Sequence, residues 1–280
     1  MIFVAPSADF SANRIGTVEI PVQMTETTTR VLSYFSQSPN MQIKEALNWF
    51  IYSCEQDGLW AKLKFISMPF LANNVNEAII NVQTGKGWVR SDMNDTANAV
   101  SSAFQVVDKA LKVVAGQKKH FLYTGDMQTD DMSVGCYVHD RGTPSGKNDV
   151  VIGSSTSAYF LALAEKQGAN IVSFVKPAAV HNNFYISLEN NHFAGVSNHN
   201  QQSRACIADQ THDVSFTNTS MRVKWFEFGN KDQATYTDGS SWAYMRQSLA
   251  MFFVGDGMTT EEFSKFKTYV DNLMKVVYQS

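Results

Sequence analysis

The strongest constraint on this chain is a succession of short apolar segments between residues 118 and 254. Each has the length of a strand, and turn-forming clusters such as Arg141-Gly142-Thr143-Pro144 separate neighbouring segments. Many short strands spaced about 8–12 residues apart are typical of β-sandwiches and jelly rolls. The pattern predicts strands at 120–123, 132–139, 149–152, 158–163, 170–174, 184–188, 193–196, 205–208, 214–217, 221–228 and 249–254.

The end of the chain predicts a strand followed by a helix. Gly255-Asp256-Gly257 after the last apolar segment is turn chemistry. Thr259 and Glu262 then have the spacing of a capping box, in which hydroxyl and carboxylate satisfy free N–H groups of the first helical turn. One helical stripe follows, made of Phe263, Phe266, Val270, Leu273 and Val277. We expect this helix to pack on the sheet that the last strand closes.

A second amphipathic helix is predicted near the beginning, at 41–57. Its apolar face consists of Ile43, Leu47, Phe50, Ile51 and Cys54. Gly58 follows, where helices commonly end in a left-handed residue. A shorter helical pattern covers 25–36, a strand is expected at 64–70, and Asn74 with Glu77 predicts a short helix over 74–82.

Residues 99–116 fit two structures. Val100, Phe104, Val107 and Leu111 have helical spacing, whereas 104–107 and 111–114 also fit two strands around a turn at 108–109. Valine favours strands over helices, so we expect a hairpin.

Composition excludes several classes of function. The chain has 280 residues and a net charge of −3, which gives no reason to expect nucleic-acid or anionic-membrane binding. No apolar run approaches the roughly 18–20 residues that span a bilayer, and the N-terminus does not resemble a signal peptide. The three cysteines, Cys54, Cys136 and Cys206, have neither disulfide-framework nor zinc spacing, so core thiols in a reducing compartment are expected.

No sequence motif identifies a reaction. Phosphate-binding glycine loops, an HExxH helix and a GxSxG nucleophile are missing from the sequence. A retaining glycosidase needs two carboxylates about 5 Å apart, but Glu189 and Glu227 stand alone in their segments. His181, His192 and His199 share one Asn-rich region, and we interpret them as polar loop residues rather than metal ligands. The sequence therefore predicts a protein that is not an enzyme and has neither cofactor nor metal.

Recognition of sugars remains as a candidate chemistry. Loops rich in Asn, Ser, Thr and aromatic residues hydrogen-bond polyols and stack on sugar faces. The candidate glycan-binding residues are Asn182, Asn183, Asn190, Asn191, His192, Asn198, His199 and Asn200, with Trp242 and Tyr244 in the stretch 236–244. The alternative stays open that these Asn residues only form turns and that Trp242 belongs to the core.

Both ends of the chain resemble a known family. The ending has the pattern F-x-G-[DR]-x-[LM]-[ST] followed by a helix, carried by Phe253, Gly255, Asp256, Met258, Thr259, Glu262, Phe266, Val270 and Leu273. A segment near the beginning of the chain, before most of the predicted strands, carries a second pattern at Gly58, Leu59, Trp60, Lys62, Asn74, Glu77 and Ala78. Together they resemble phage and prophage virion proteins with a concanavalin-like, laminin-G-like jelly roll. The resemblance implies a mainly β jelly-roll sandwich with N-terminal helices and a C-terminal helix packed on the sheet.

The resemblance also implies a role on the phage particle. Residues 1–40 become an arm and short helix that anchor the protein to other virion proteins, and 41–280 become the displayed sandwich. The candidate anchor residues are Ile2, Phe3, Val4, Phe10, Ile15, Val18 and Ile20. By analogy the protein is expected to form a homo-oligomer such as a trimer, assembled in the host cytoplasm, on a tail fibre, baseplate or head, and to bind host-surface glycan. The alternatives are a capsid decoration protein without ligand and, less favoured, a glycan-degrading enzyme.

Overall fold

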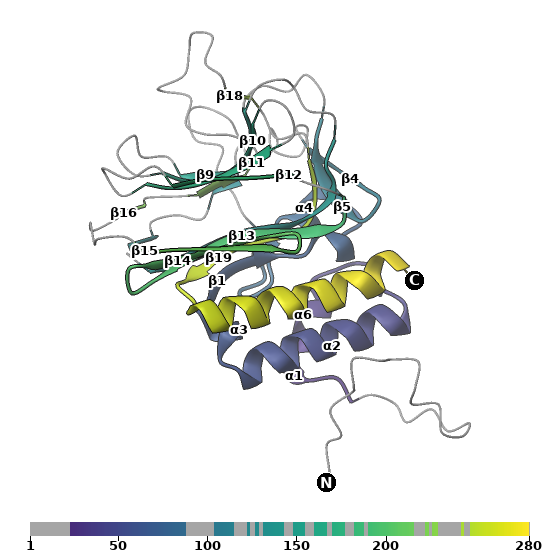
Figure 1. Ribbon diagram of the computed structural model, residues 1–280. Helices are drawn as coiled ribbons and strands as arrows, with labels where there is room; N and C mark the ends of the chain where they lie inside the picture. The colour runs from purple at the N-terminus through teal and green to yellow at the C-terminus, as the bar shows by residue number, and fades with distance from the viewer. Residues whose placement is uncertain are drawn as a thin grey trace.

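The computed structural model describes residues 23–87, 104–114, 122–123, 127–128, 131–142, 148–154, 160–166, 170–176, 182–187, 190–215, 222–223, 226–228, 242–243 and 247–279. Two antiparallel sheets lie face to face, and a layer of helices covers the outer face of the larger sheet (Figure 1). The predicted mainly β fold with a C-terminal helix packed on the sheet is confirmed.

The larger sheet has the strand order β15-β14-β13-β8-β19-β5-β4, with β1 also paired to β19. Its strands are β1 (Leu63–Ser67), β4 (Phe104–Val107), β5 (Ala110–Val113), β8 (Met132–Asp140), β13 (His192–His199), β14 (Gln202–Ile207), β15 (Gln210–Ser215) and β19 (Ser248–Asp256). Central strands β8 and β19 are buried along almost their whole length, because both faces of this sheet are covered.

The second sheet has the order β12-β11-β10-β9-β17-β6, with β18 paired in parallel to β9. Its strands are β6 (Leu122–Tyr123), β9 (Asn148–Ser154), β10 (Phe160–Lys166), β11 (Asn170–Lys176), β12 (Asn182–Ser187), β17 (Phe226–Phe228) and β18 (Trp242–Ala243). Two further pairs are β2 (Ile80–Asn81) with β3 (Lys86–Gly87), and β7 (Met127–Gln128) with β16 (Arg222–Val223).

The strand pairing is nested as in a jelly roll. Early strands pair with late ones: β5 with β19 in the larger sheet and β6 with β17 in the second. The chain crosses between sheets from β5 to β6, from β8 to β9 and from β12 to β13. Each predicted strand segment overlaps a strand of the structure, although the segment 214–217 shares only two residues with β15, and the segment 221–228 divides into β16 and β17.

The helix layer consists of α1 (Glu26–Leu32), α2 (Met41–Gln56) and α6 (Thr260–Gln279). The predicted apolar stripes of α2 and α6 are all buried, and the two helices pack against each other through Phe50 and Phe266. Phe266 also contacts Phe253 of β19 with ring centroids 4.8 Å apart, which joins the helices to the sheet. Helix α1, within the expected arm, packs on α2 and buries Val31.

The short elements between α2 and the sandwich differ from the prediction. Gly58, in the left-handed conformation, leads into α3 (Leu59–Lys62). Strand β1 ends at Ser67, and Pro69–Leu71 forms a 3-10 turn because Pro cannot donate to a strand ladder. Helix α4 (Val75–Ala78) has the predicted Asn74 cap but lasts one turn, and β2 follows at once.

The ambiguous segment forms the hairpin β4–β5. Its turn residues Asp108 and Lys109 have φ of 50° and 61°, the geometry of a two-residue turn with both central residues left-handed. A second correction concerns Gly255 and Asp256, which continue β19 rather than forming a turn. A Cβ at Gly255 would collide with the backbone carbonyl of Lys62, so the glycine allows α3 and β1 to approach β19 closely.

Candidate functional site

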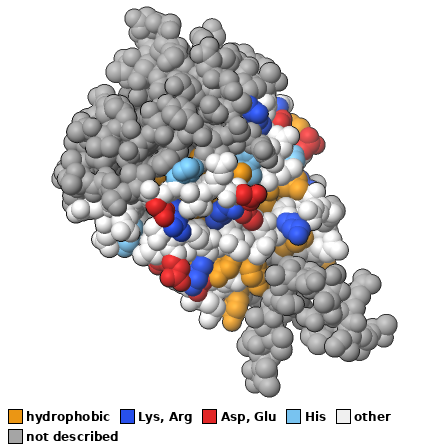
Figure 2. Space-filling model, viewed as in Figure 1, with side chains coloured by type: hydrophobic (Ala, Val, Ile, Leu, Met, Phe, Trp, Pro, Cys, Tyr) orange, Lys and Arg blue, Asp and Glu red, His pale blue; other side chains and the backbone are white. Residues whose placement is uncertain are grey.

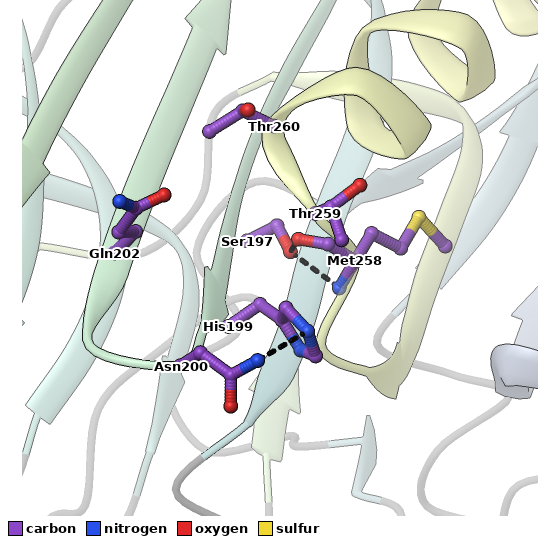
Figure 3. Close-up of a pocket in the computed structure, with 7 residues that line it drawn as sticks. All are labelled: Ser197, His199, Asn200, Gln202, Met258, Thr259 and Thr260. Atoms are coloured by element: carbon purple, nitrogen blue, oxygen red, sulfur yellow. Dashed lines mark hydrogen bonds between the residues drawn. The ribbon is translucent and has the colours of Figure 1, made fainter.

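A pocket of about 270 Å³ lies where the end of β13 meets the start of α6. Figure 3 shows residues from β13, the β13–β14 turn, the start of β14, the loop before α6 and the first residue of α6 around it. The lining residues are Ser197, His199, Asn200, Gln202, Met258, Thr259 and Thr260. The pocket is slightly smaller than the roughly 300–1,000 Å³ of sites for drug-sized ligands.

Ser197 holds the floor of the pocket together. Its Oγ accepts a hydrogen bond of 2.8 Å from the Met258 N–H and donates one of 2.8 Å to the Met258 carbonyl. The Oγ of Ser133, on β8, lies 2.8 Å from the Ser197 Oγ. Because Ser197 is buried, this network fixes the loop before α6 against the sheet.

His199 lines one wall of the pocket, and Asp131 lies beside it. The His199 Nδ1 lies 2.9 Å from the Asp131 Oδ2, an ion-pair distance without the alignment of a hydrogen bond. The same carboxylate accepts a 2.9 Å hydrogen bond from the Asn200 N–H, and the Asn200 side-chain nitrogen lies 2.9 Å from the His199 Nε2. Asp131 therefore orients both the imidazole and the tip of the β13–β14 turn.

The start of α6 forms the opposite wall. The predicted capping box is confirmed: the Glu262 N–H donates to the Thr259 Oγ1 at 3.2 Å, and the Thr259 N–H donates to the Glu262 Oε2 at 2.7 Å. Lys62 of α3 contacts both Glu262 carboxylate oxygens at 2.8 and 2.6 Å. The helix start that carries Thr259 and Thr260 is thus fixed by the sequence-local box and a distant lysine.

Of the residues predicted to bind glycan, the structure places His199 and Asn200 in the pocket. Asn198 is adjacent in sequence but fully buried on the opposite face of β13, among residues that face the second sheet, because side chains alternate along a strand. Its amide atoms have no hydrogen-bond partner among the described residues. This burial conflicts with the exposure that glycan contact requires.

Asn190, Asn191 and His192 lie at the other end of β13, where His192 is about 23 Å from His199 along the strand at roughly 3.3 Å per residue. Asn190 accepts a hydrogen bond from the Arg141 N–H, and the Asn191 Oδ1 lies 2.8 Å from the His139 Nδ1. Asn191 also has a φ of 58°, which fits its predicted alternative role in a turn. His192 is buried, and burial lowers its pKa to about 4.

The remaining predicted residues lie in β12, in β18 or outside the described residues. Asn182 and Asn183 belong to β12 and Trp242 to β18, where only the backbone is described. Tyr244 and the anchor residues Ile2, Phe3, Val4, Phe10, Ile15, Val18 and Ile20 lie outside the described residues. The glycan and anchor roles of these residues stay predictions.

Sequence reasoning missed most of the pocket, namely Ser197, Gln202, Met258 and Thr260. Thr259 was identified only as a helix cap. Nothing in the sequence links residues 197–202 to 258–260, because the two segments meet only when β13 and β19 enter the same sheet on either side of β8.

Within the described ranges, no three His, Cys, Asp or Glu side chains are grouped as metal ligands require. No helix in the described part of the chain is long and apolar enough to cross a membrane. Cys54, Cys136 and Cys206 are free and buried, as predicted, and burial raises the pKa of each thiol.

No protein-family model matches the chain, and no curated protein matches it significantly. Among solved structures it is similar to a botulinum neurotoxin serotype D/C binding domain (TM-score 0.41, 11% identity, 57% of this chain and 43% of that one). It is also similar to a Trypanosoma rangeli sialidase (0.36, 9%, 61% and 30%) and to alginate lyase A1-II′ (0.38, 14%, 70% and 95%).

The chain spans less than half the length of the neurotoxin and sialidase structures. At TM-scores below 0.5, these likenesses carry no argument about ligand or reaction. The fold assignment rests on the strand pairing, and the site rests on its own geometry.

Proposed function

We propose that this chain is a non-enzymatic structural protein of a phage virion that binds host-surface glycan through the pocket between β13 and α6. The observation that carries the binding role is the lining itself. Hydroxyl groups of Thr259 and Thr260, amides of Asn200 and Gln202, and the His199 imidazole surround one opening. Such groups both donate and accept hydrogen bonds, as sugar hydroxyls require.

The binding role is tested with purified protein on a glycan array and on host cells. His199→Ala and Gln202→Ala remove pocket groups and should each weaken binding at least several-fold, with little change in melting temperature. Gln210→Ala is the matched control for Gln202→Ala, because Gln210 is also exposed on the neighbouring strand but lies outside the pocket. Binding that survives both pocket variants would place the glycan elsewhere, and a folded protein that binds no glycan would contradict the role.

The virion role rests on the sequence resemblance, with residues 1–40 as anchor and a homo-oligomer such as a trimer as the displayed form. Deleting residues 1–22 should leave the helix layer and sandwich folded, as judged by circular dichroism, but prevent incorporation into phage particles. Loss of folding would instead make this segment part of the core and contradict the anchor. Normal incorporation of the folded, truncated protein would contradict it as well.

The non-enzymatic character is proposed because the sequence lacks a carboxylate pair of glycosidase type. Prolonged incubation with each bound glycan should release no shorter products, as measured by mass spectrometry. Product release that disappears in His199→Ala would establish a glycan-degrading enzyme instead.

A further inference from the structure

We infer that the pocket selects neutral sugars and rejects anionic ones such as sialic and uronic acids. This inference rests on the proposed glycan-binding role and concerns the same site. Among the described residues, Arg204 and Lys62 contact the segment 257–260, and both cations are already held by carboxylates and backbone oxygens. Two acidic groups, Asp131 and Glu262, contact lining residues of the pocket.

Arg204 of β14 is the first of these cations. Its Nε and Nη2 donate to the two Asp213 carboxylate oxygens at 2.7 and 2.6 Å. Its Nη1 donates to the Thr260 carbonyl at 2.8 Å and to the Ser264 Oγ at 2.6 Å. Four hydrogen bonds thus occupy a guanidinium that has five N–H groups, and its charge faces Asp213. A ligand carboxylate would have to displace this bidentate pair to use Arg204.

Lys62 is the second cation, and its ammonium group donates hydrogen bonds to both carboxylate oxygens of Glu262. The positive end of the α6 dipole is also offset, because Glu261 and Glu262 lie in the first turn. Glu262 takes the Thr259 N–H that an incoming anion would otherwise contact. This helix start is therefore a poor anion site despite its position beside the pocket.

Asp131 adds negative charge to the wall that carries His199. A ligand carboxylate near His199 would meet this acidic group and lose its own hydration without gaining a free cation. The side chains that line the opening, by contrast, are hydroxyls, amides, a thioether and an imidazole. Among the coloured residues in Figure 2, basic and acidic side chains adjoin one another.

The test measures binding of the full-length protein to immobilised neutral and anionic polysaccharides. Dextran, mannan and galactan serve as neutral probes, and polysialic acid and alginate as anionic probes, at 20 and 150 mM salt. We expect at least one neutral probe to bind at least tenfold more tightly than either anionic probe at 20 mM salt. The difference should narrow at 150 mM, because salt screens the repulsion.

The possible outcomes distinguish a failure of the neutral-sugar selectivity from a failure of the glycan-binding role itself. Equal or tighter binding of an anionic probe, lost in His199→Ala, would overturn the selectivity and leave the glycan-binding role intact. Binding of no probe by folded protein would overturn both. Tighter binding of a neutral probe, lost in His199→Ala, would support both.

A charge reversal tests the cause. Glu261→Lys changes a side chain that is 81% exposed, in the first turn of α6 but outside the lining. It should increase affinity for alginate several-fold at 20 mM salt and leave affinity for the neutral probe unchanged. Glu26→Lys, on exposed Glu26 in the first turn of α1, alters the net charge equally and should leave both affinities unchanged. Equal effects of the two variants would mean that overall charge, not the pocket, decides selectivity.

Discussion

At the scale of single residues, buried polar side chains explain how the pocket is held. Ser197 is 1% exposed, yet its hydroxyl serves both the N–H and the C=O of Met258. A buried backbone N–H without a partner costs more than a typical hydrogen bond gains. The loop before α6 therefore depends on one strand residue that belongs to a distant part of the sequence.

Ser197→Ala should lower the free energy of unfolding by about 1–3 kcal/mol, because it leaves the Met258 N–H buried without its acceptor. Thr268→Ala is the control, since the exposed Thr268 hydroxyl bonds only the preceding turn of its own helix, at the Ser264 carbonyl. Urea denaturation of both variants measures the difference. A Ser197→Ala cost no larger than that of Thr268→Ala would contradict this role of the hydroxyl.

His192 shows a second effect of burial on a single residue. Burial disfavours the charged imidazole, and nearby Lys267 acts in the same direction, so the pKa falls from 6.5 to about 4. Between these values the unfolded chain binds a proton that the folded protein does not. Acid therefore favours unfolding through His192, and its contribution to stability is complete above pH 6.5 and is lost as the pH falls to 4.

His192→Gln should flatten this part of the stability profile. Between pH 7.5 and pH 4, the free energy of unfolding should fall by about 3 kcal/mol more in the wild type than in the variant. This amount corresponds to the difference between the His192 pKa in the unfolded and folded protein. Urea denaturation at pH 4.0, 5.0, 6.0 and 7.5 measures both proteins, whatever the variant costs at pH 7.5. Parallel profiles over this range would show that His192 titrates normally in the folded protein.

At the scale of elements, close approach between the sheet and the helices depends on residues without side chains. Gly135 of β8 lies beside Phe253 of β19, and an added Cβ would come within 2.6 Å of the phenyl ring and 2.9 Å of the Ala194 carbonyl. Phe253 in turn packs against Phe266 of α6. The position of α6 on the sheet thus depends on the flat surface that Gly135 provides.

Gly135→Ala should destabilise the protein by about 1–3 kcal/mol, the usual cost of overpacking a core. Gly87→Ala is the matched control, because a Cβ there meets nothing within 4 Å. Differential scanning calorimetry of the two variants measures the contrast. Equal melting temperatures would mean that Phe253 moves aside freely and that the contact with α6 is not constrained.

At the scale of the whole molecule, the larger sheet is the shared centre of two cores. One face packs on the helices through residues such as Phe193 and Phe253, and the other carries Val134, Val196 and Phe252 toward the second sheet. Helices and sheet should therefore unfold together rather than in separate steps.

Phe266→Ala removes the ring that joins α2, α6 and β19, and should cost about 3–5 kcal/mol. Far-ultraviolet circular dichroism and intrinsic fluorescence should still report a single coincident transition at a lower urea concentration. Val107→Ala is the control, because Val107 is 39% exposed at the sheet edge. Two separated transitions in Phe266→Ala would show that the helix layer and the sandwich are independent units.

The sequence by itself determined what is encoded locally. Hydrophobic periodicity and turn chemistry over a few residues were enough to predict several features. These are the apolar stripes of α2 and α6, the capping box at Thr259 and Glu262, and the hairpin turn at Asp108 and Lys109. The regular spacing of short apolar segments indicated the β-sandwich, because this spacing is also visible locally in the sequence. Helix α4 and the turn after β19 were misjudged in length, because β2 pairs with β3 directly after α4 and because β19 pairs with the distant strand β8 as far as Asp256.

Only the tertiary structure decided where the candidate site lies. His199 and Asn198 are neighbours in sequence, but strand alternation directs one to the pocket and buries the other in the opposite face. The pocket also needs residues 258–260, which reach residues 197–202 because β8 pairs with both β13 and β19. Such pairings depend on which apolar faces bury each other over the whole chain, and no local pattern in the sequence contains that information.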